Sequence, residues 1–332
     1  MANLRAGLIG LGMMGRHHGR VLSGLEGVDL VAVADASGED PHHVAKGRPF
    51  CTSVEELLEH DLDYCMVAVP TVYHEPVALA LAAAGVHAMI EKPLAQDTPA
   101  AEKIAKAFED AGLVGAVGHI ERYNPALQQA RRRLEEGELG DVYQIVTRRQ
   151  GPFPARIADV GVVKDLATHD IDLTSWVRQQ PFAAVAARVA HRSGREFEDL
   201  VSVTGQLADG TVTSHLVNWL SPFKERVTII TGEKGAFVAD TLTADLTFHA
   251  NGSVKTTWFD IARFRGVSEG DVIRYAIPKR EPLAVEHENF RDAVLGKESD
   301  IVMLAQGLAT VRVAEAAIES SRTGRTIDLP SV

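Results

Sequence analysis

A glycine-rich turn near the N-terminus constrains the fold of this chain more than any other feature. An apolar run at residues 4–9 predicts a buried strand before the turn, and an amphipathic segment at residues 13–25 predicts a helix after it. In such a unit the first glycine permits a tight bend, the second lets the backbone approach a diphosphate, and the third lets the helix pack on the strand. We therefore expect a diphosphate site at the positive end of the helix. The predicted diphosphate site consists of Gly10, Gly12, Met13, Met14 and Gly15.

A second apolar strand, at residues 30–34, ends in an acidic residue. This residue, Asp35, lies 20 positions after Gly15, where a carboxylate accepts hydrogen bonds from an adenosine ribose and repels a 2′-phosphate. Ala36 follows it, so no arginine is at hand to bind such a phosphate. The sequence therefore predicts NAD rather than NADP. A chance glycine-rich turn is the alternative, and the strand, helix and acid together argue against it.

Strands and helices continue to alternate up to about residue 119, which predicts a doubly wound parallel sheet. Ligands bind such sheets at the carboxyl ends of the strands, where two segments of this chain fall. One contains Pro70, Thr71 and His74, and the other contains Glu91 and Lys92; we assign both to the cofactor site. Pro93 biases Lys92 away from helical geometry. A lysine there can bind a substrate hydroxyl and stabilise a developing oxyanion, and a lysine that merely reaches solvent is the alternative.

The second half of the chain has a different pattern. Closely spaced β-rich runs between residues 182 and 259, separated by turn sequences, predict an antiparallel sheet, and helices at 282–295 and 302–321 close the chain. We therefore expect a dinucleotide-binding domain at residues 1–120. An α+β domain with a large, open and mostly antiparallel sheet follows at 121–332, and the C-terminal helices can pack back on the first domain.

One helix between these regions carries an acid–base pattern. Asp165, His169 and Asp172 are spaced i, i+4 and i+7, so on a regular helix they share one face. Carboxylates beside a histidine orient its ring and favour its protonated form, and such a histidine can take a proton from a hydroxyl whose carbon loses a hydride. A solvated polar stripe and a metal site are the alternatives, and we predict no metal.

Composition excludes several other classes of protein. The net charge of −11 over 332 residues argues against binding to nucleic acid or to anionic membranes. No run approaches the ~20 apolar residues that cross a bilayer, and no secretory signal is visible. The two cysteines, Cys51 and Cys65, have no disulfide or zinc pattern. We expect a cytoplasmic enzyme.

These landmarks, together with Arg122-Tyr123-Asn124-Pro125, resemble the Gfo/Idh/MocA family of glucose–fructose oxidoreductases and inositol dehydrogenases over nearly the whole chain. The resemblance implies an active site between a Rossmann domain and an open-sheet domain, and a homodimer or homotetramer formed through the outer face of the sheet. It assigns catalysis to Lys92, Asp165 and His169, with His169 as the proton acceptor. It places Tyr123 and Asn124 with these three residues in the substrate site, whereas Asp172 could instead support the helix.

Within that family, residues 148–172 are most similar to enzymes that oxidise C3 of UDP-N-acetylglucosamine. Arg148, Arg149 and Arg156 place three cations near the acid–base helix, and arginines suit diphosphate oxygens. Neighbours in a strand point to opposite faces, so we assign substrate binding to Arg149 and Arg156, although ion pairs are the alternative. Inositol or a free sugar is the second candidate substrate. A sensor that binds NAD or sugar without catalysis is the alternative of another class, and the full acid–base set argues against it.

Overall fold

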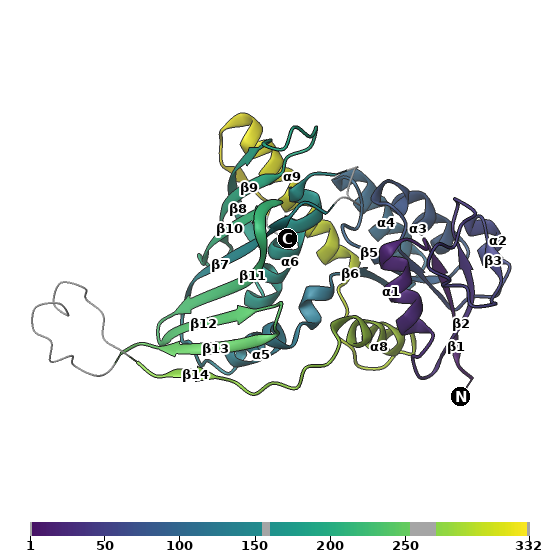
Figure 1. Ribbon diagram of the computed structural model, residues 1–332, viewed down its shortest axis with the longest axis horizontal. Coiled ribbons are helices and arrows are strands. Elements are labelled where there is room, and N and C mark those ends of the chain that lie inside the picture. The colour runs from purple at the N-terminus through teal and green to yellow at the C-terminus, as the bar shows by residue number, and fades with distance from the viewer. Residues whose placement is uncertain (1, 155–159, 253–269, 331–332) are drawn as a thin grey trace, which may run out of the picture. The chain divides into compact units, whose positions relative to one another are not determined.

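The computed structural model describes residues 2–154, 160–252 and 270–330, which form two compact units (Figure 1). The first contains the chain up to residue 120 together with residues 281–315, and the second contains residues 121–280 and 316–332. Helix α9, Leu304–Thr323, contributes residues to both units. Within the described ranges, no helix is long and apolar enough to cross a membrane.

The first unit is built on a parallel sheet of six strands in the order β3-β2-β1-β4-β5-β6. Between β1 and β4 the direction in which strands are added reverses, which creates the crevice where doubly wound sheets bind ligands. This arrangement confirms the predicted Rossmann fold. The strands are β1 (Leu4–Ile9), β2 (Val28–Ala34), β3 (Phe50–Cys51), β4 (Tyr64–Val67), β5 (His87–Glu91) and β6 (Gly115–Gly118).

Two helices of this unit, α2 and α4, begin at a side-chain cap. Ser53 accepts a hydrogen bond from the backbone N–H of Glu56 at the start of α2, and Asp97 does the same for Ala100 at the start of α4. The glycine-turn helix α1 ends at Leu22, earlier than expected, because the chain turns at Ser23 and Gly24. The bounds are α1 (Met13–Leu22), α2 (Val54–Leu58), α3 (His74–Ala83), α4 (Thr98–Asp110) and α8 (Pro282–Val294).

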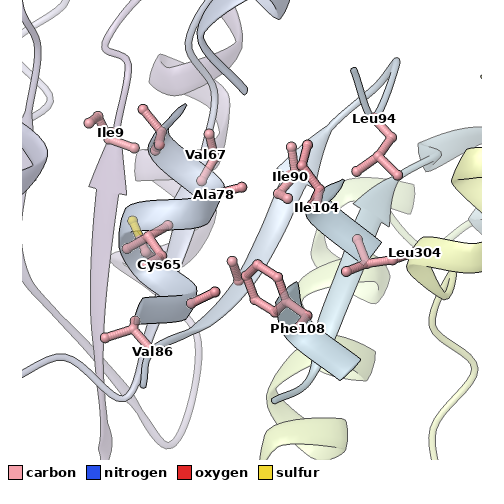
Figure 2. Packing of buried hydrophobic residues seen from close by; sticks show 14 of the residues in the cluster. Ile9, Cys65, Val67, Ala78, Val86, Ile90, Leu94, Ile104, Phe108 and Leu304 are labelled. Atoms are coloured by element: carbon pink, nitrogen blue, oxygen red, sulfur yellow. The ribbon is translucent and has the colours of Figure 1, made fainter. Parts of the chain in front are cut away.

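Apolar side chains fill the space between the sheet and its helices. Figure 2 shows one such cluster, to which Val67 and Ile90 contribute from the strands, and Phe108 from α4. These three side chains are at most 1% exposed. Leu304 of α9 belongs to the same cluster, so a residue near the end of the chain completes the core of the first unit.

The second unit is built on a sheet of nine described strands in the order β14-β13-β12-β11-β7-β10-β9-β8-β15. β7 and β10 are parallel, and the other neighbours pair antiparallel, which confirms the expected mostly antiparallel sheet. The strands are β7 (Val142–Pro152), β8 (Phe182–Ala190), β9 (Leu200–Leu207), β10 (Val212–Asn218), β11 (Leu220–Gly232), β12 (Gly235–Asp240), β13 (Asp245–Ala250), β14 (Val272–Arg274) and β15 (Ile327–Asp328).

The helices α5 (Pro125–Glu135) and α6 (Thr168–Arg178) pack against one face of this sheet (Figure 1). Their buried side chains join Ile145, Ile230 and Phe237 of the strands in one core. Because side chains alternate along a strand, the residues next to these point to the opposite face. The helix-covered face therefore carries the core of the second unit.

Candidate active site

The glycine turn between β1 and α1 has the geometry of a diphosphate cradle. Gly10 has a φ of 92°, in the left-handed region that favours glycine, and a Cβ on Gly15 would lie 1.9 Å from the Gly10 carbonyl oxygen. A Cβ on Gly12 would instead meet no described atom within 4 Å, so the turn is open on the side where a ligand can approach the backbone. Met13 and Met14 begin α1 beside it, and no side chain caps this helix N-terminus. These residues fit a dinucleotide diphosphate.

Asp35 follows β2 and lies next to the glycine turn. Its Oδ2 accepts a hydrogen bond of 2.7 Å from the backbone N–H of Leu11, and Oδ1 accepts two from Ser37. Partial burial alone would raise the pKa of this carboxyl, but these hydrogen bonds hold its pKa below the ordinary value. The structure thus has an ionised carboxylate beside the cradle, as ribose recognition requires.

His74 has a structural contact in place of the predicted cofactor contact. Its side chain is buried, with Nδ1 3.0 Å from the Pro93 carbonyl oxygen and Nε2 3.0 Å from the Val69 carbonyl oxygen. The ring thereby links the loop after β4 to the loop after β5. Pro70 and Thr71 lie on the first of these loops, where Pro70 is exposed. His74 therefore supports the ligand-facing loops rather than facing a ligand with its ring.

Glu91 ends β5 at the carboxyl edge of the sheet, and Lys92 follows it directly. The Glu91 side chain is buried, and its Oε2 accepts a 2.9 Å hydrogen bond from the backbone N–H of Lys92. Its Oε1 lies 2.9 Å from Nε2 of His18. Burial would raise the pKa of this carboxyl, but the His18 hydrogen bond and the nearby charges hold the pKa of Glu91 below its ordinary value. The Glu91 carboxylate thus lies inside the first unit, and the side chain of the next residue, Lys92, is half-buried.

The acid–base segment is not one regular α-helix as the spacing argument assumed. A π-helical segment, Val163–Ala167, carries Asp165, and α6 follows with His169 in its first turn. The wider π turn changes the angle between residues on either side of it, and such turns are frequent at functional sites. Glu198 binds the start of the segment through the backbone N–H groups of Val162 and Val163. Asp165 is buried, and His169 is partly exposed.

Asp172 belongs to a buried ion pair. Nε and Nη2 of Arg122 donate hydrogen bonds of 2.8 and 2.6 Å to its two carboxylate oxygens, and both side chains are at most 6% exposed. This bidentate contact joins the segment before α5 to α6. Asp172 thus supports the helix, the second of the two roles that the sequence left open.

Asn124 also has a structural role where substrate binding was predicted. Its Oδ1 caps α5 by accepting from the backbone N–H of Ala126, and its Nδ2 donates to the Thr241 carbonyl oxygen. Its side chain is buried, as is that of Tyr123. A buried cap that uses both its oxygen and its nitrogen does not suit a ligand contact, so we withdraw Asn124 as a substrate-binding residue.

The three arginines near the acid–base helix have different environments. Arg149 is buried, and its guanidinium contacts Asp170 at 3.1 Å and Glu121 at 2.8 Å. Burial would lower the pKa of Arg149, but these two carboxylates raise it, so the group is a charged structural ion pair rather than a phosphate ligand. Arg148 points to the other face and pairs with Glu225 at 2.8 Å. Arg156 lies outside the described residues.

The predicted site residues fall into two groups. The cradle, Asp35, Glu91 and Lys92 lie in the first unit, whereas Asp165 and His169 lie in the second.

Sequence reasoning missed His18, although it shares the buried stripe of α1 with Gly15, Gly19 and Leu22. The position of His18 on this stripe could have indicated that its side chain is buried. In the described part of the chain, no group of three or more His, Cys, Asp or Glu side chains is arranged to hold a metal ion.

Both units of the chain are similar to those of known proteins. The family model for oxidoreductases with an NAD-binding Rossmann fold (GFO_IDH_MocA) matches residues 4–119, and the GFO/IDH/MocA C-terminal domain model matches residues 127–238. A UDP-N-acetylglucosamine 3-dehydrogenase from Acidithiobacillus ferrooxidans is 30% identical over 325 residues, which is 96% of each chain. An inositol 2-dehydrogenase from Rhizobium meliloti is 24% identical over 98% of this chain and 99% of its own. A solved structure of the Acidithiobacillus enzyme has a TM-score of 0.84 at 26% identity, covering 97% of this chain and 99% of that one.

Proposed function

The chain belongs to the GFO/IDH/MocA family of oxidoreductases and is an NAD-dependent sugar dehydrogenase, and we propose that its substrate is UDP-N-acetylglucosamine, oxidised at C3 to a keto-sugar. The observation that carries this choice of substrate is the similarity to a UDP-N-acetylglucosamine 3-dehydrogenase along 96% of both chains. A match of that extent includes both units.

The chemistry assigns one task to each of three side chains. An imidazole nitrogen of His169 takes the proton of the sugar hydroxyl, and Asp165 is the acid of the same segment that we assign to the site with it. The Lys92 ammonium stabilises the negative charge that develops on the same oxygen. NAD, when bound, would supply the acceptor for the hydride, so that the C–H bond breaks as the C=O bond forms. The released proton balances the reaction as alcohol plus NAD gives ketone, NADH and a proton.

The diphosphate of the substrate requires a cation that binds its oxygens. Arg149 is engaged by two carboxylates, so of the two arginines assigned to the substrate, Arg156 remains the candidate. Arg156→Ala should raise KM for UDP-N-acetylglucosamine and leave kcat nearly unchanged. The expected loss of binding free energy is about 1.5–3 kcal/mol, the range for a hydrogen bond to a charged group. Arg148→Ala is the matched control, because Arg148 pairs with Glu225 on the other face of the strand, and its KM should stay at the wild-type value.

Inositol is the second candidate substrate, and two observations favour it. The inositol 2-dehydrogenase from Rhizobium meliloti aligns with 98% of this chain, and the burial of Arg149 removes one predicted phosphate ligand. Formation of NADH with UDP-N-acetylglucosamine, N-acetylglucosamine, myo-inositol and scyllo-inositol separates the two candidates. We expect the highest kcat/KM with the UDP-sugar. A higher value with either inositol would replace our proposal with the second candidate.

We also propose that two copies of the chain associate through the face of the nine-stranded sheet opposite α5 and α6. Val146, Ile229 and Val238 lie side by side there on β7, β11 and β12, and each is half-buried within one chain. A row of adjacent apolar side chains that remain half-buried within one chain favours association with another copy. Light scattering after size exclusion should find a dimer or tetramer for the wild type and a smaller species for Ile229→Glu. A monomeric wild type would contradict this interface.

A further inference from the structure

The first unit contains a row of buried polar side chains that ends at Glu91, the residue before Lys92. Oε1 of Glu91 is 2.9 Å from Nε2 of His18, and Nδ1 of His18 is 2.8 Å from Nε2 of His287. Both histidines are fully buried, and their rings meet edge to face with centroids 5.1 Å apart. None of the sequence motifs includes His18 or His287. We call Glu91, His18 and His287 the buried triad.

The hydrogen bonds of the triad have a defined direction at Glu91. An ionised carboxylate only accepts, so Nε2 of His18 must be the donor to Oε1. The other oxygen, Oε2, accepts from the backbone N–H of Lys92 at 2.9 Å. The two bonds together fix the plane of the carboxylate, and through it the backbone of the residue whose side chain we assign to catalysis. His287 in turn fixes the ring of His18 from its far side.

The triad joins three elements that are distant in the sequence. His18 lies on α1, the helix whose N-terminus forms the glycine cradle; Glu91 ends β5, and His287 lies on α8. Figure 1 shows α8 beside α1, in agreement with their contacts. The triad therefore links the helix that begins at the glycine cradle to β5, the strand that Lys92 follows. Rigid links of this kind set the distance between groups that must meet during a reaction.

A second buried acid on α8 does not compete with Glu91. Glu286 is 1% exposed, and neither carboxyl oxygen has a hydrogen-bond partner among the described residues. Burial, together with the negative charge of Glu91, raises the pKa of Glu286 well above its ordinary value, so the folded protein favours the protonated form of this carboxyl. Glu91 consequently remains the ionised acceptor for His18 and for the N–H of Lys92.

We propose that His18 and His287 are positioning residues for Lys92, acting through Glu91, whose carboxylate holds the Lys92 backbone where its side chain can reach the substrate hydroxyl. The inference rests on the proposed function in assigning Lys92 to catalysis. It concerns two histidines that never touch the substrate, so their removal should affect the rate of the chemical step more than the binding of either ligand.

His18→Leu tests the proposal, because leucine fills much of the space but donates no hydrogen bond. We expect kcat to fall about 10- to 100-fold, since small misplacements of a catalytic group cost about that much. KM for the sugar should change less than threefold, by our estimate from the same reasoning. The deuterium isotope effect on kcat should rise as hydride transfer becomes slower. His18→Gln should restore most of kcat, because its amide N–H can reach Glu91.

His87→Leu is the matched control. His87 lies at the other end of β5 and accepts a hydrogen bond from the backbone N–H of Val114, so its loss also removes one histidine contact from this strand. We expect wild-type kcat for this control. A wild-type kcat in His18→Leu, or an equal loss in His18→Leu and His87→Leu, would overturn the proposal, because the effect would then be absent or merely structural.

A readout without substrate separates this inference from the proposed function. In protein labelled with ¹⁵N-lysine, the amide signal of Lys92 should shift in His18→Leu and return toward its wild-type position in His18→Gln. An unmoved signal would overturn the positioning role even if the enzyme oxidises no UDP-sugar. If His18→Leu does not fold, Glu91→Gln and Glu91→Ala replace it. Both remove the charge, but only glutamine can still accept from Lys92, so an equal fall in kcat for the two would refute positioning through that hydrogen bond.

Discussion

Substitution of Asp172 distinguishes a supporting residue from a catalytic one. Asp172→Asn keeps the shape of the side chain but leaves the Arg122 guanidinium with no opposite charge at the two places where Asp172 accepted its hydrogen bonds. Because both side chains are at most 6% exposed, water cannot replace the lost carboxylate. The substitution should therefore destabilise the second unit while leaving the chemistry of the folded enzyme intact.

The expected magnitude follows from the burial of the pair. Removing one partner of a buried ion pair costs about 3–5 kcal/mol. For a domain of roughly 150–250 residues, each kcal/mol lowers Tm by about 2–4 °C, so the transition of the second unit should fall by roughly 6–20 °C. The double variant Arg122→Met with Asp172→Leu should recover most of this loss, because apolar replacement of a whole buried pair is often neutral or stabilising.

Differential scanning calorimetry measures the transition, and NADH formation well below it gives kcat. The control is Glu136→Gln directly after α5, which removes a 3.7 Å pair with Arg132 in which both side chains are more than half exposed. That substitution should change Tm little, because exposed pairs contribute little. If Asp172→Asn keeps the wild-type Tm but loses kcat by 100-fold or more, Asp172 is a catalytic residue and our reasoning from the ion pair is wrong.

Three further predictions concern the cofactor, the catalytic groups and pH. His169→Ala and Lys92→Met should each lower kcat by about 10²–10⁴-fold while NADH affinity, measured by fluorescence titration, stays near normal; wild-type kcat in either would refute its role. Asp35→Ser combined with Ala36→Arg should shift the ratio of kcat/KM values toward NADP, and tighter NADP than NAD binding by the unmodified protein would contradict the choice of cofactor. Folded Glu286 keeps its proton well above its ordinary pKa of 4.5, so as pH rises above that value the unfolded chain loses a proton that the folded protein still binds. Stability from this group therefore falls with rising pH, by at most about 1.4 kcal/mol per pH unit, and Glu286→Gln should raise Tm more at pH 8 than at pH 5. An equal change at the two pH values would show that Glu286 is ionised in the folded protein.

The Rossmann unit was predictable apart from its two-residue edge strand β3, because its longer buried strands are apolar runs and its turns carry glycine signals. The glycine cradle and Asp35 came from the same local pattern, since the residues that form them are close in the sequence. Asn124 was predictable as a helix cap as well, because an asparagine directly before Pro125 is a typical helix start. Its similarity to a family motif drew attention to substrate binding instead.

The contacts that the sequence did not reveal join distant residues. Arg122 and Asp172 are 50 positions apart, and His18 and His287 are 269 apart, so no periodicity relates them. The π turn at Asp165 was also hidden, because one wide turn does not change composition and shifts the apolar pattern by only one residue. Alternation along the strand correctly required Arg148 and Arg149 to face opposite ways, but only the fold identified Asp170 as the partner of Arg149.

The most direct test of the proposed function follows the hydride itself. UDP-N-acetylglucosamine deuterated at C3 is incubated with the enzyme and NAD, and the reduced cofactor is analysed by mass spectrometry. We predict that the deuterium appears in the reduced nicotinamide and that a 3-keto-sugar is formed in equal amount. Unlabelled cofactor from this substrate, together with deuterium transfer from inositol labelled at its reacting carbon, would contradict the account and assign the enzyme to inositol.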